Sequence, residues 1–271
     1  MAKRGCTSAA QLTRPGRGAS GCDDRTRIDD SQRLFLVADG SGPTYGGIYA
    51  PMGLERGLEV LASALDPARH AEHVCDEGCV QKAFASANGA MWALHEAFTA
   101  RFESELAVTP DDRLQASLRA WKQIAREHLG RELATFAHSG GSVTALLLAG
   151  DRAHVGQVGL CRAYRCRRGR VELLLRDQGI EKPEGLDDAF SHGIASVLLG
   201  LQPTVPVETR ALAFEPGDRF VLCSDGVWSL ANDVALAAAC RHDRADDIVA
   251  ELSAVVKDNE DDVAIVAVVM G

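Results

Sequence analysis

Residues 212–228 read LAFEPGDRFVLCSDGVW and hold the most informative pattern of the chain. A Pro-Gly turn leads into the apolar run RFVLC, which predicts a buried strand. The strand ends at Asp225 and Gly226, so a carboxylate stands where the chain leaves the sheet. Asp-Gly alone is a common turn dipeptide, and its meaning therefore depends on the rest of the chain.

Two further aspartates stand at the ends of apolar runs. Asp39 and Gly40 close the run LFLVADG, and Asp261 comes just before the last run, VAIVAVV. Strand ends can gather carboxylates around hard cations, and an adjacent glycine lets its carbonyl approach the metal closely. Carboxylates brought together without cations would repel one another. The pattern therefore predicts a metal site.

The order of the predicted elements favours an α+β fold. Helical spacing appears in 54–65, with leucines on one face, in 80–100, and more weakly in 114–129. Beyond Ser139 the β-rich pieces SVTALLLAG, RAHVGQVG, CRAYRCRRG and RVELLLRD are separated by turns, as in an antiparallel meander. Residues 177–196 are expected to form an exposed loop. Later elements are predicted as strands in PVETRALAF and RFVLCSDG, helices over 234–240 and 245–256, and a closing strand in DDVAIVAVV.

Composition excludes several classes of protein. The 271 residues are 46% hydrophobic, enough for a real core. A net charge of −9 argues against nucleic acid or a membrane surface as partner. Residues 1–16 are polar and basic without an apolar stretch behind them, so we expect a flexible N-terminal tail, no secretory signal and a cytoplasmic protein. Cysteines in apolar runs, such as Cys161, Cys166 and Cys223, predict buried reduced thiols.

Taken in order, LFLVADGSG, SGGSVTALLLAGDRAHVGQVGLCRAYRCRRG, LAFEPGDRFVLCSDGVW and DDVAIVAVV resemble the PPM family, the type 2C metal-dependent serine/threonine protein phosphatases. The resemblance covers residues 17–271 and implies a single phosphatase domain there. It implies a four-layer αββα sandwich of two antiparallel sheets flanked by helices. It also implies hydrolysis of phosphoserine and phosphothreonine on protein substrates, with a serine/threonine kinase as the opposing enzyme.

The resemblance assigns roles to individual residues. Asp39 would bridge two Mn²⁺ or Mg²⁺ ions and, with Asp225, form the catalytic centre around a metal-activated water. Asp23 would either support the ligands from behind or hold a metal through a water. Asp258-Asn259 is an alternative for the last motif, but only Asp261-Asp262 is followed at once by the apolar strand. The implied metal ligands are Asp24, Asp39, Gly40, Asp225 and Asp261.

The sequence departs from the family pattern near the expected substrate. The phosphate-binding arginine is replaced by Ala19; Arg17 is the best substitute, and Arg25 and Arg27 are poorer ones. Leu160 and Ser229 stand where acids for a third metal would be, so a third metal is not expected. These departures leave an alternative open, a catalytically weak PPM-like domain that binds a partner. A phosphatase that acts on small phosphorylated metabolites is a third hypothesis.

Other candidate residues have ordinary explanations. His70, His73, Cys75 and Cys79 are zinc-type ligands, but their spacing fits no common zinc finger, and an exposed turn is the simpler interpretation. His138 and His192 are candidates for a general acid toward the leaving alkoxide, with solvated loop histidines as the alternative. Trp228 is expected to pack in the core.

Overall fold

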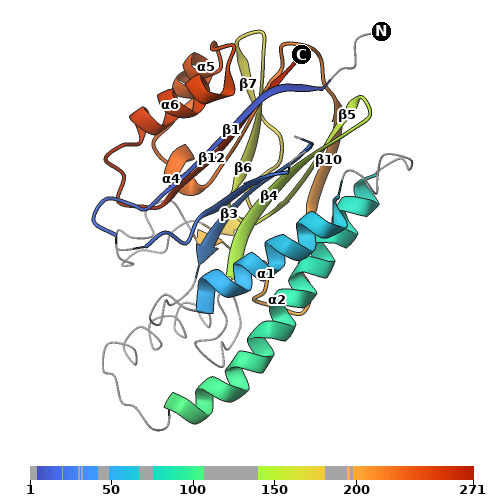
Figure 1. Ribbon diagram of the computed structural model, residues 1–271, viewed down its shortest axis with the longest axis vertical. Coiled ribbons are helices and arrows are strands. Elements are labelled where there is room, and N and C mark those ends of the chain that lie inside the picture. The colour runs from blue at the N-terminus through green and yellow to red at the C-terminus, as the bar shows by residue number, and fades with distance from the viewer. Residues whose placement is uncertain are drawn as a thin grey trace.

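The computed structural model describes residues 5–19, 21–29, 31, 33–41, 49–66, 76–106, 140–180, 194–195 and 198–271. Two five-stranded antiparallel sheets dominate this part of the chain (Figure 1). The first has the order β1-β12-β11-β6-β7 and the second β10-β5-β4-β3-β2. The strands are β1 (Cys6–Arg14), β2 (Arg25–Ile28), β3 (Leu34–Ser41), β4 (Gly140–Ala149), β5 (Arg152–Val158), β6 (Arg162–Arg167), β7 (Arg170–Leu173), β8 (Gly179–Ile180), β9 (Ile194–Ala195), β10 (Glu208–Ala213), β11 (Arg219–Cys223) and β12 (Val263–Met270).

Helices cover the outer faces of both sheets. Helices α1 and α2 lie against β3 and β4, and α5 and α6 cover the sheet that holds β11 and β12 (Figure 1). The bounds are α1 (Tyr49–Ala64), α2 (Glu77–Leu106), α4 (Asp225–Trp228), α5 (Asp233–Ala239) and α6 (Ala245–Val255). The order helix, sheet, sheet, helix confirms the expected αββα sandwich. No described helix is long and apolar enough to cross a membrane.

Strand β12 shows why the apolar runs became central strands. All eight of its residues are buried. Ala264, Val266 and Val268 face the core between the sheets, whereas Val263 and Ile265 face α5 and α6. Because side chains alternate between the two faces of a strand, a strand covered on both faces must be apolar throughout.

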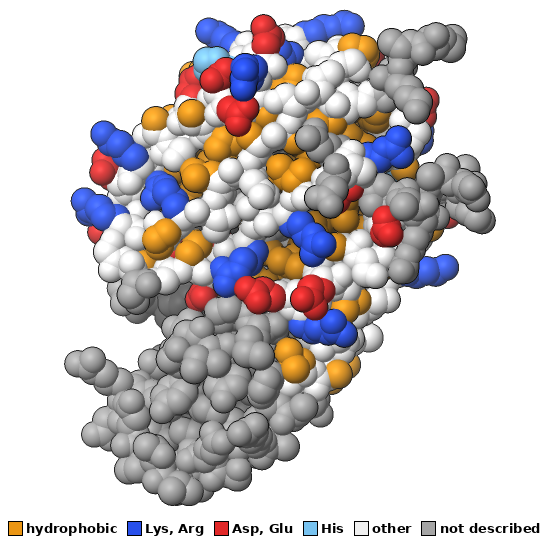
Figure 2. All heavy atoms as spheres, in the orientation of Figure 1, with side chains coloured by type: hydrophobic (Ala, Val, Ile, Leu, Met, Phe, Trp, Pro, Cys, Tyr) orange, Lys and Arg blue, Asp and Glu red, His pale blue; other side chains and the backbone are white. Residues whose placement is uncertain are grey.

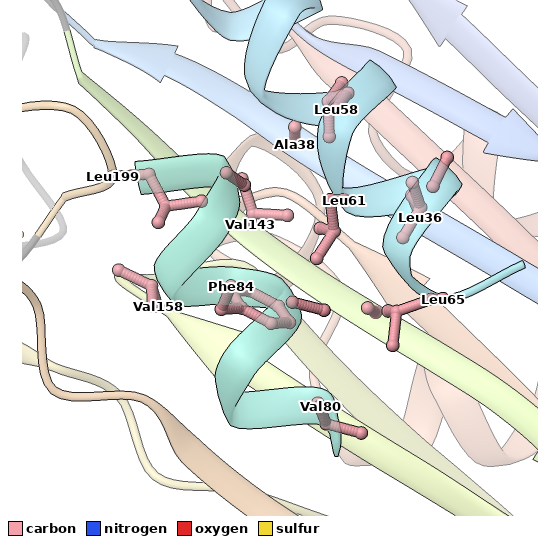
Figure 3. Close-up of a cluster of buried hydrophobic side chains, with 14 of the residues drawn as sticks. Leu36, Ala38, Leu58, Leu61, Leu65, Val80, Phe84, Val143, Val158 and Leu199 are labelled. Atoms are coloured by element: carbon pink, nitrogen blue, oxygen red, sulfur yellow. The ribbon is translucent and has the colours of Figure 1, made fainter. Parts of the chain in front are cut away.

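The second helical layer follows the spacing expected from the sequence. Leu54, Leu58, Leu61 and Leu65 are all buried, on the face of α1 and its last turn that meets the sheet. Figure 3 shows leucines of α1 and Phe84 of α2 pointing toward the strands beneath them. Burying such side chains contributes about 1.5–3 kcal/mol each relative to exposure. The helix predicted over 114–129 lies outside the described residues.

The N-terminal segment corrects one expectation. Residues 6–14, assigned from the sequence to a flexible tail, form β1 and pair along their length with β12. The residues of β1 are half-buried or exposed, and few of its side chains are strongly apolar, so its own sequence is a weak signal. Its order comes from the main-chain hydrogen bonds that β12 offers.

Two other regions lie only partly within the description. Residues 177–180 and 194–195 of the expected loop are described, and β8 pairs there with β9. His138, His192, His70, His73 and Cys75 lie outside the described residues, so their candidate roles stay predictions. Cys161, Cys166 and Cys223 are buried and free, as expected.

Candidate metal centre

The predicted acids stand at one end of the sandwich, where strands of both sheets begin or finish. Asp39 lies near the end of β3 in one sheet, and Asp225 follows β11 in the other. Asp24 precedes β2, and Asp261 precedes β12. Ser224 donates its backbone N–H to Ala264 O at 3.1 Å, which sets the end of β11 beside the start of β12. Four segments far apart in the chain therefore meet here.

Glycine at position 226 allows this close approach. A Cβ added to Gly226 would overlap the carbonyl oxygen of Asp262. Asn259 closes the same contact from its side, because its Nδ2 donates to Gly226 O at 2.6 Å. The Ser-Asp-Gly motif thus lets the turn after β11 pack directly against the turn before β12.

Asp24 is the deepest of the acids, with 1% of its surface exposed. Burial raises its pKa well above the ordinary value, a hydrogen bond from Ser224 opposes this, and the charges of Asp225 and Asp262 raise it further. One of its oxygens, Oδ2, is buried and has no hydrogen-bond partner within the part of the chain that the structure describes. Buried polar atoms almost always have partners, so this oxygen fits the ligand role expected of Asp24.

Asp39 and Asp225 are half-buried and interact electrostatically with Asp24. Burial raises the pKa of Asp39 well above its ordinary range, and the charges of Asp225, Asp24 and Asp261 add to the effect. Burial, followed by the charge of Asp261, raises the pKa of Asp225 to about 7. Groups that raise one another's pKa in this way lie within electrostatic reach.

Asp261 is exposed and stands at the rim of this group. The charge of Asp261 is among the largest influences on Asp24, Asp39 and Asp225, whereas that of Asp258, the alternative for the last motif, is not. The register with β12, which favoured Asp261 in the sequence, agrees with this placement.

Asp23 and Gly40 lie against each other. A Cβ added to Gly40 would stand 3.0 Å from both the Cβ and the carbonyl oxygen of Asp23. Burial raises the pKa of Asp23, the charge of Asp262 adds to this and Arg25 opposes it. The Gly40 backbone and the Asp23 side chain are therefore neighbours, as a shared role at the metal would require.

Asp262 is a residue whose role was not recognised from the sequence. Its Oδ1 accepts the backbone N–H of Gly16 at 2.9 Å, and its Oδ2 accepts that of Asp23 at 2.6 Å. The carboxylate therefore fixes the loop that carries Asp24 to the start of β12. Ser224 was also missed: its Oγ accepts from Ala264 N at 2.9 Å and bonds to Asp24. The only signal for these two residues in the sequence is their position next to Asp261 and Asp225.

The arginines near the site have different surroundings. Arg17, the predicted phosphate ligand, is exposed and pairs with Glu260 at 3.3 Å. Arg25 donates to the carbonyl oxygens of Cys22 and Asp24 at 2.6 and 2.8 Å and so holds the loop before β2. Arg27 is exposed on β2.

Arg162 lies two residues after Leu160, the position at which the family pattern has an acid for a third metal. Arg162 binds Asp177 through Nε and Nη2, at 3.0 and 2.6 Å, and lies 3.6 Å from the centre of the Trp228 ring. Trp228 packs partly against the core, as expected, and donates Nε1–H to Leu160 O at 2.9 Å. Leu160 itself is buried. These contacts link Arg162, Asp177, Trp228 and the main chain of Leu160 without an acid at position 160.

The acids are gathered without forming a finished cation site. Among the described residues, no three His, Cys, Asp or Glu side chains converge closely enough to be a ready-made site. Oxygen donors of this kind still suit hard cations such as Mg²⁺ and Mn²⁺, and the partnerless oxygen of Asp24 agrees with such a ligand set. The individual ligand assignments stay predictions.

Comparison with known proteins agrees with this fold. Residues 164–270 match the family described as stage II sporulation protein E (SpoIIE). A serine/threonine phosphatase, stp, of Listeria innocua is 26% identical over 133 residues, 42% of this chain and 51% of that protein. The chain's match thus spans about half the length of that curated relative.

Solved structures resemble the chain over nearly its whole length. The PPM Ser-Thr phosphatase MsPP from Mycobacterium smegmatis, crystallised with cacodylate, has a TM-score of 0.69 and 21% identity, covering 98% of this chain and 100% of its own. The catalytic domain of the phosphatase PstP with two manganese ions has a TM-score of 0.63 and 20% identity, covering 97% of each chain. The chain therefore has the fold of the PPM serine/threonine phosphatases, and its resemblance to that family is confirmed.

Proposed function

We propose that the chain is a metal-dependent phosphatase that hydrolyses phosphoserine and phosphothreonine on protein substrates. The observation that carries the proposal is that Asp24, Asp39, Asp225 and Asp261 stand at strand ends that meet at one end of a PPM fold, within electrostatic reach of one another. Their partners in catalysis would be two Mn²⁺ or Mg²⁺ ions. A phosphatase structure that resembles this chain holds two manganese ions, which supports that choice.

The acids differ in how deeply they are buried. Buried Asp24 would hold the cations at the bottom of the site, and half-buried Asp39 and Asp225 would hold them from the sides. The Gly40 carbonyl and Asp23 would complete one side, and Asp261 closes the exposed rim. Two bound cations supply an activated water and neutralise the charge of the phosphoryl oxygens.

Arg17 would bind the substrate phosphate. Its guanidinium pairs with Glu260 at 3.3 Å, and both side chains are mostly exposed. Exposed ion pairs contribute only about 0–1 kcal/mol, so Arg17 can exchange Glu260 for a phosphate at little cost. A serine/threonine kinase as partner and a cytoplasmic location stay predictions.

A specific observation favours the alternative, a catalytically weak PPM-like domain that binds a partner. Arg17 points to Glu260, and buried Leu160 occupies the place of an acid. In this alternative the acids would bind cations for stability while turnover stays very slow.

Hydrolysis of p-nitrophenyl phosphate and of a phosphothreonine peptide, with Mn²⁺, Mg²⁺ or EDTA, tests the proposal. The expected result is metal-dependent turnover in the wild type that is lost in Asp225→Asn. Asp233→Asn, an exposed aspartate of α5 with the same change of charge, is the matched control and should keep full activity. Folded wild type without turnover in any metal would favour the binding domain instead.

A further inference from the structure

A pocket of about 680 Å³ lies on the β6–β7 hairpin. Its lining includes Arg165, Arg167, Arg168 and Arg170, together with Val171 and Glu172. The hairpin begins beside the acids, because Arg162 is paired with Cys223 in the sheet, and it runs away from them to its turn. The pocket, here called the arginine pocket, therefore belongs to the opposite end of this sheet.

The charge of the hairpin contrasts with that of the chain. The segment RAYRCRRGRVE, residues 162–172, holds five arginines and one glutamate, whereas the chain carries a net charge of −9. Basic side chains appear at this end of the molecule in Figure 2, together with acidic ones. A basic pocket on an acidic protein attracts anions locally while the rest of the surface repels them.

Two of the arginines are held in place by buried or half-buried acids. Arg167 binds Asp218 through Nε and Nη2, both at 2.6 Å, and Asp218 is 1% exposed. Arg165 pairs with Glu172, which Arg210 also contacts at 2.7 Å. These bonds fix the walls of the pocket before any ligand arrives, which lowers the entropy cost of binding.

The guanidinium groups of the other two arginines, Arg168 and Arg170, are exposed to solvent. Arg168 is 85% exposed and meets Glu215 only at 3.5 Å, a pair that contributes little. Arg170 is exposed, and its side chain makes no hydrogen bond or ion pair with the residues that the structure describes. Both guanidinium groups can therefore donate to an incoming anion.

The turn itself is unfavourable for arginine. Arg168 has φ 52° and Gly169 has φ 76°, both in the left-handed region, between the paired residues Arg167 and Arg170. Two-residue turns of this kind favour Asn, Asp or Gly, and other side chains are strained there. Arg168 gains little packing in return because it is exposed. A conformational cost without a packing gain points to a use for its charge.

Strand β7 adds a main-chain element beside the pocket. It is the last strand of its sheet within the described part of the chain, so one edge is not paired. Leu173 on this strand is 38% exposed. Extended peptides bind such edges through main-chain hydrogen bonds, and side-chain pockets then supply specificity.

We propose that the arginine pocket binds an acidic segment of a partner protein, extended along the edge of β7 that no described strand pairs with, and with its carboxylates at Arg168 and Arg170. This site goes beyond the proposed phosphatase function and does not depend on it, because the hairpin turn lies away from the acids. Asp225→Asn should therefore bind the segment as well as the wild type does.

The test uses a fluorescein-labelled ten-residue peptide of alternating Glu and Val, titrated with the full chain and followed by anisotropy. Arg168→Gln with Arg170→Gln should raise Kd about three-fold or more, since an exposed ion pair contributes up to about a five-fold change in Kd and two are lost. The matched control, Arg33→Gln with Arg56→Gln, removes the same charge from exposed positions just before β3 and on α1 and should leave Kd unchanged.

A second variant separates folding from binding. Arg168→Gly relieves the left-handed strain, so it should raise Tm slightly while it weakens peptide binding. Equal Kd values for the pocket and control variants would overturn the proposal. So would peptide displacement by inorganic phosphate or by single-stranded RNA at concentrations where a Glu-rich peptide without label does not compete, because the ligand would then be a phosphate.

Discussion

Replacing Asp225 by asparagine should make the metal-free protein more stable at pH 8. The folded carboxyl has its pKa raised from 3.8 to about 7, by burial first and by Asp261 second. Because the charged form is disfavoured on folding, the cost is absent below pH 3.8, grows between pH 3.8 and 7, and is complete above pH 7. At about 1.36 kcal/mol for each pH unit, it reaches about 4 kcal/mol. Asparagine removes this cost and keeps an oxygen that accepts the backbone N–H of Gly226.

Urea unfolding in EDTA at pH 8 and at pH 4 measures this difference. The expected gain of Asp225→Asn over the wild type is roughly 2–4 kcal/mol at pH 8 and close to zero at pH 4. A chain of this size shifts its Tm by about 2–4 °C for each kcal/mol, so thermal melting provides a second reading. Asp233→Asn, at an exposed position of α5, should show no pH-dependent gain.

Mn²⁺ should reverse the order of stability. The wild type gains stability from bound cations by mass action, and Asp225→Asn should gain much less. A variant that is no more stable than the wild type at pH 8 in EDTA would refute the reasoning, because Asp225 would then not share a site with other charged carboxylates.

Two further substitutions test other parts of the account. Asp262→Ala leaves two backbone N–H groups of the loop before β2 without their acceptor; calorimetry should show Mn²⁺ affinity reduced about ten-fold or more, since each lost bond to a charged group is worth about 1.5–3 kcal/mol, and unchanged affinity would mean that the loop is held by other contacts. Phe84→Ala removes a fully buried ring between α2 and the sheet, so urea unfolding should show a loss of about 3–5 kcal/mol, and a loss below 1 kcal/mol would contradict the packing described.

The sequence predicted the central strands because their residues are buried on both faces. The runs LFLVA in β3, ALLLA in β4 and VAIVAVV in β12 are continuously apolar, so local patterns were sufficient. The leucine spacing of α1 was equally direct. Strand β1 was missed because the run CTSAAQLTR is weakly apolar and its order depends on pairing with β12, more than 240 residues away. The four residues of β2, RTRI, are too short and polar to predict a strand.

The acids of the site were recognisable because each stands at the boundary of a strand. Asp262 and Ser224 act through hydrogen bonds to segments distant in the chain, and such bonds leave no local pattern. The arginine that would bind phosphate was the least predictable feature. Arg17 was chosen by its offset from Asp24, and its exposed pairing with Glu260 depends on how two turns meet.

Isothermal titration of the EDTA-treated, dialysed chain with Mn²⁺ at pH 7.5 tests the central claim most directly. We expect two Mn²⁺ ions per chain in the wild type and no saturable binding in Asp39→Asn, because Asp39 would contact both ions. A folded wild type that binds no Mn²⁺, or an Asp39→Asn variant that still binds two ions, would contradict the assignment of these carboxylates to a two-metal centre.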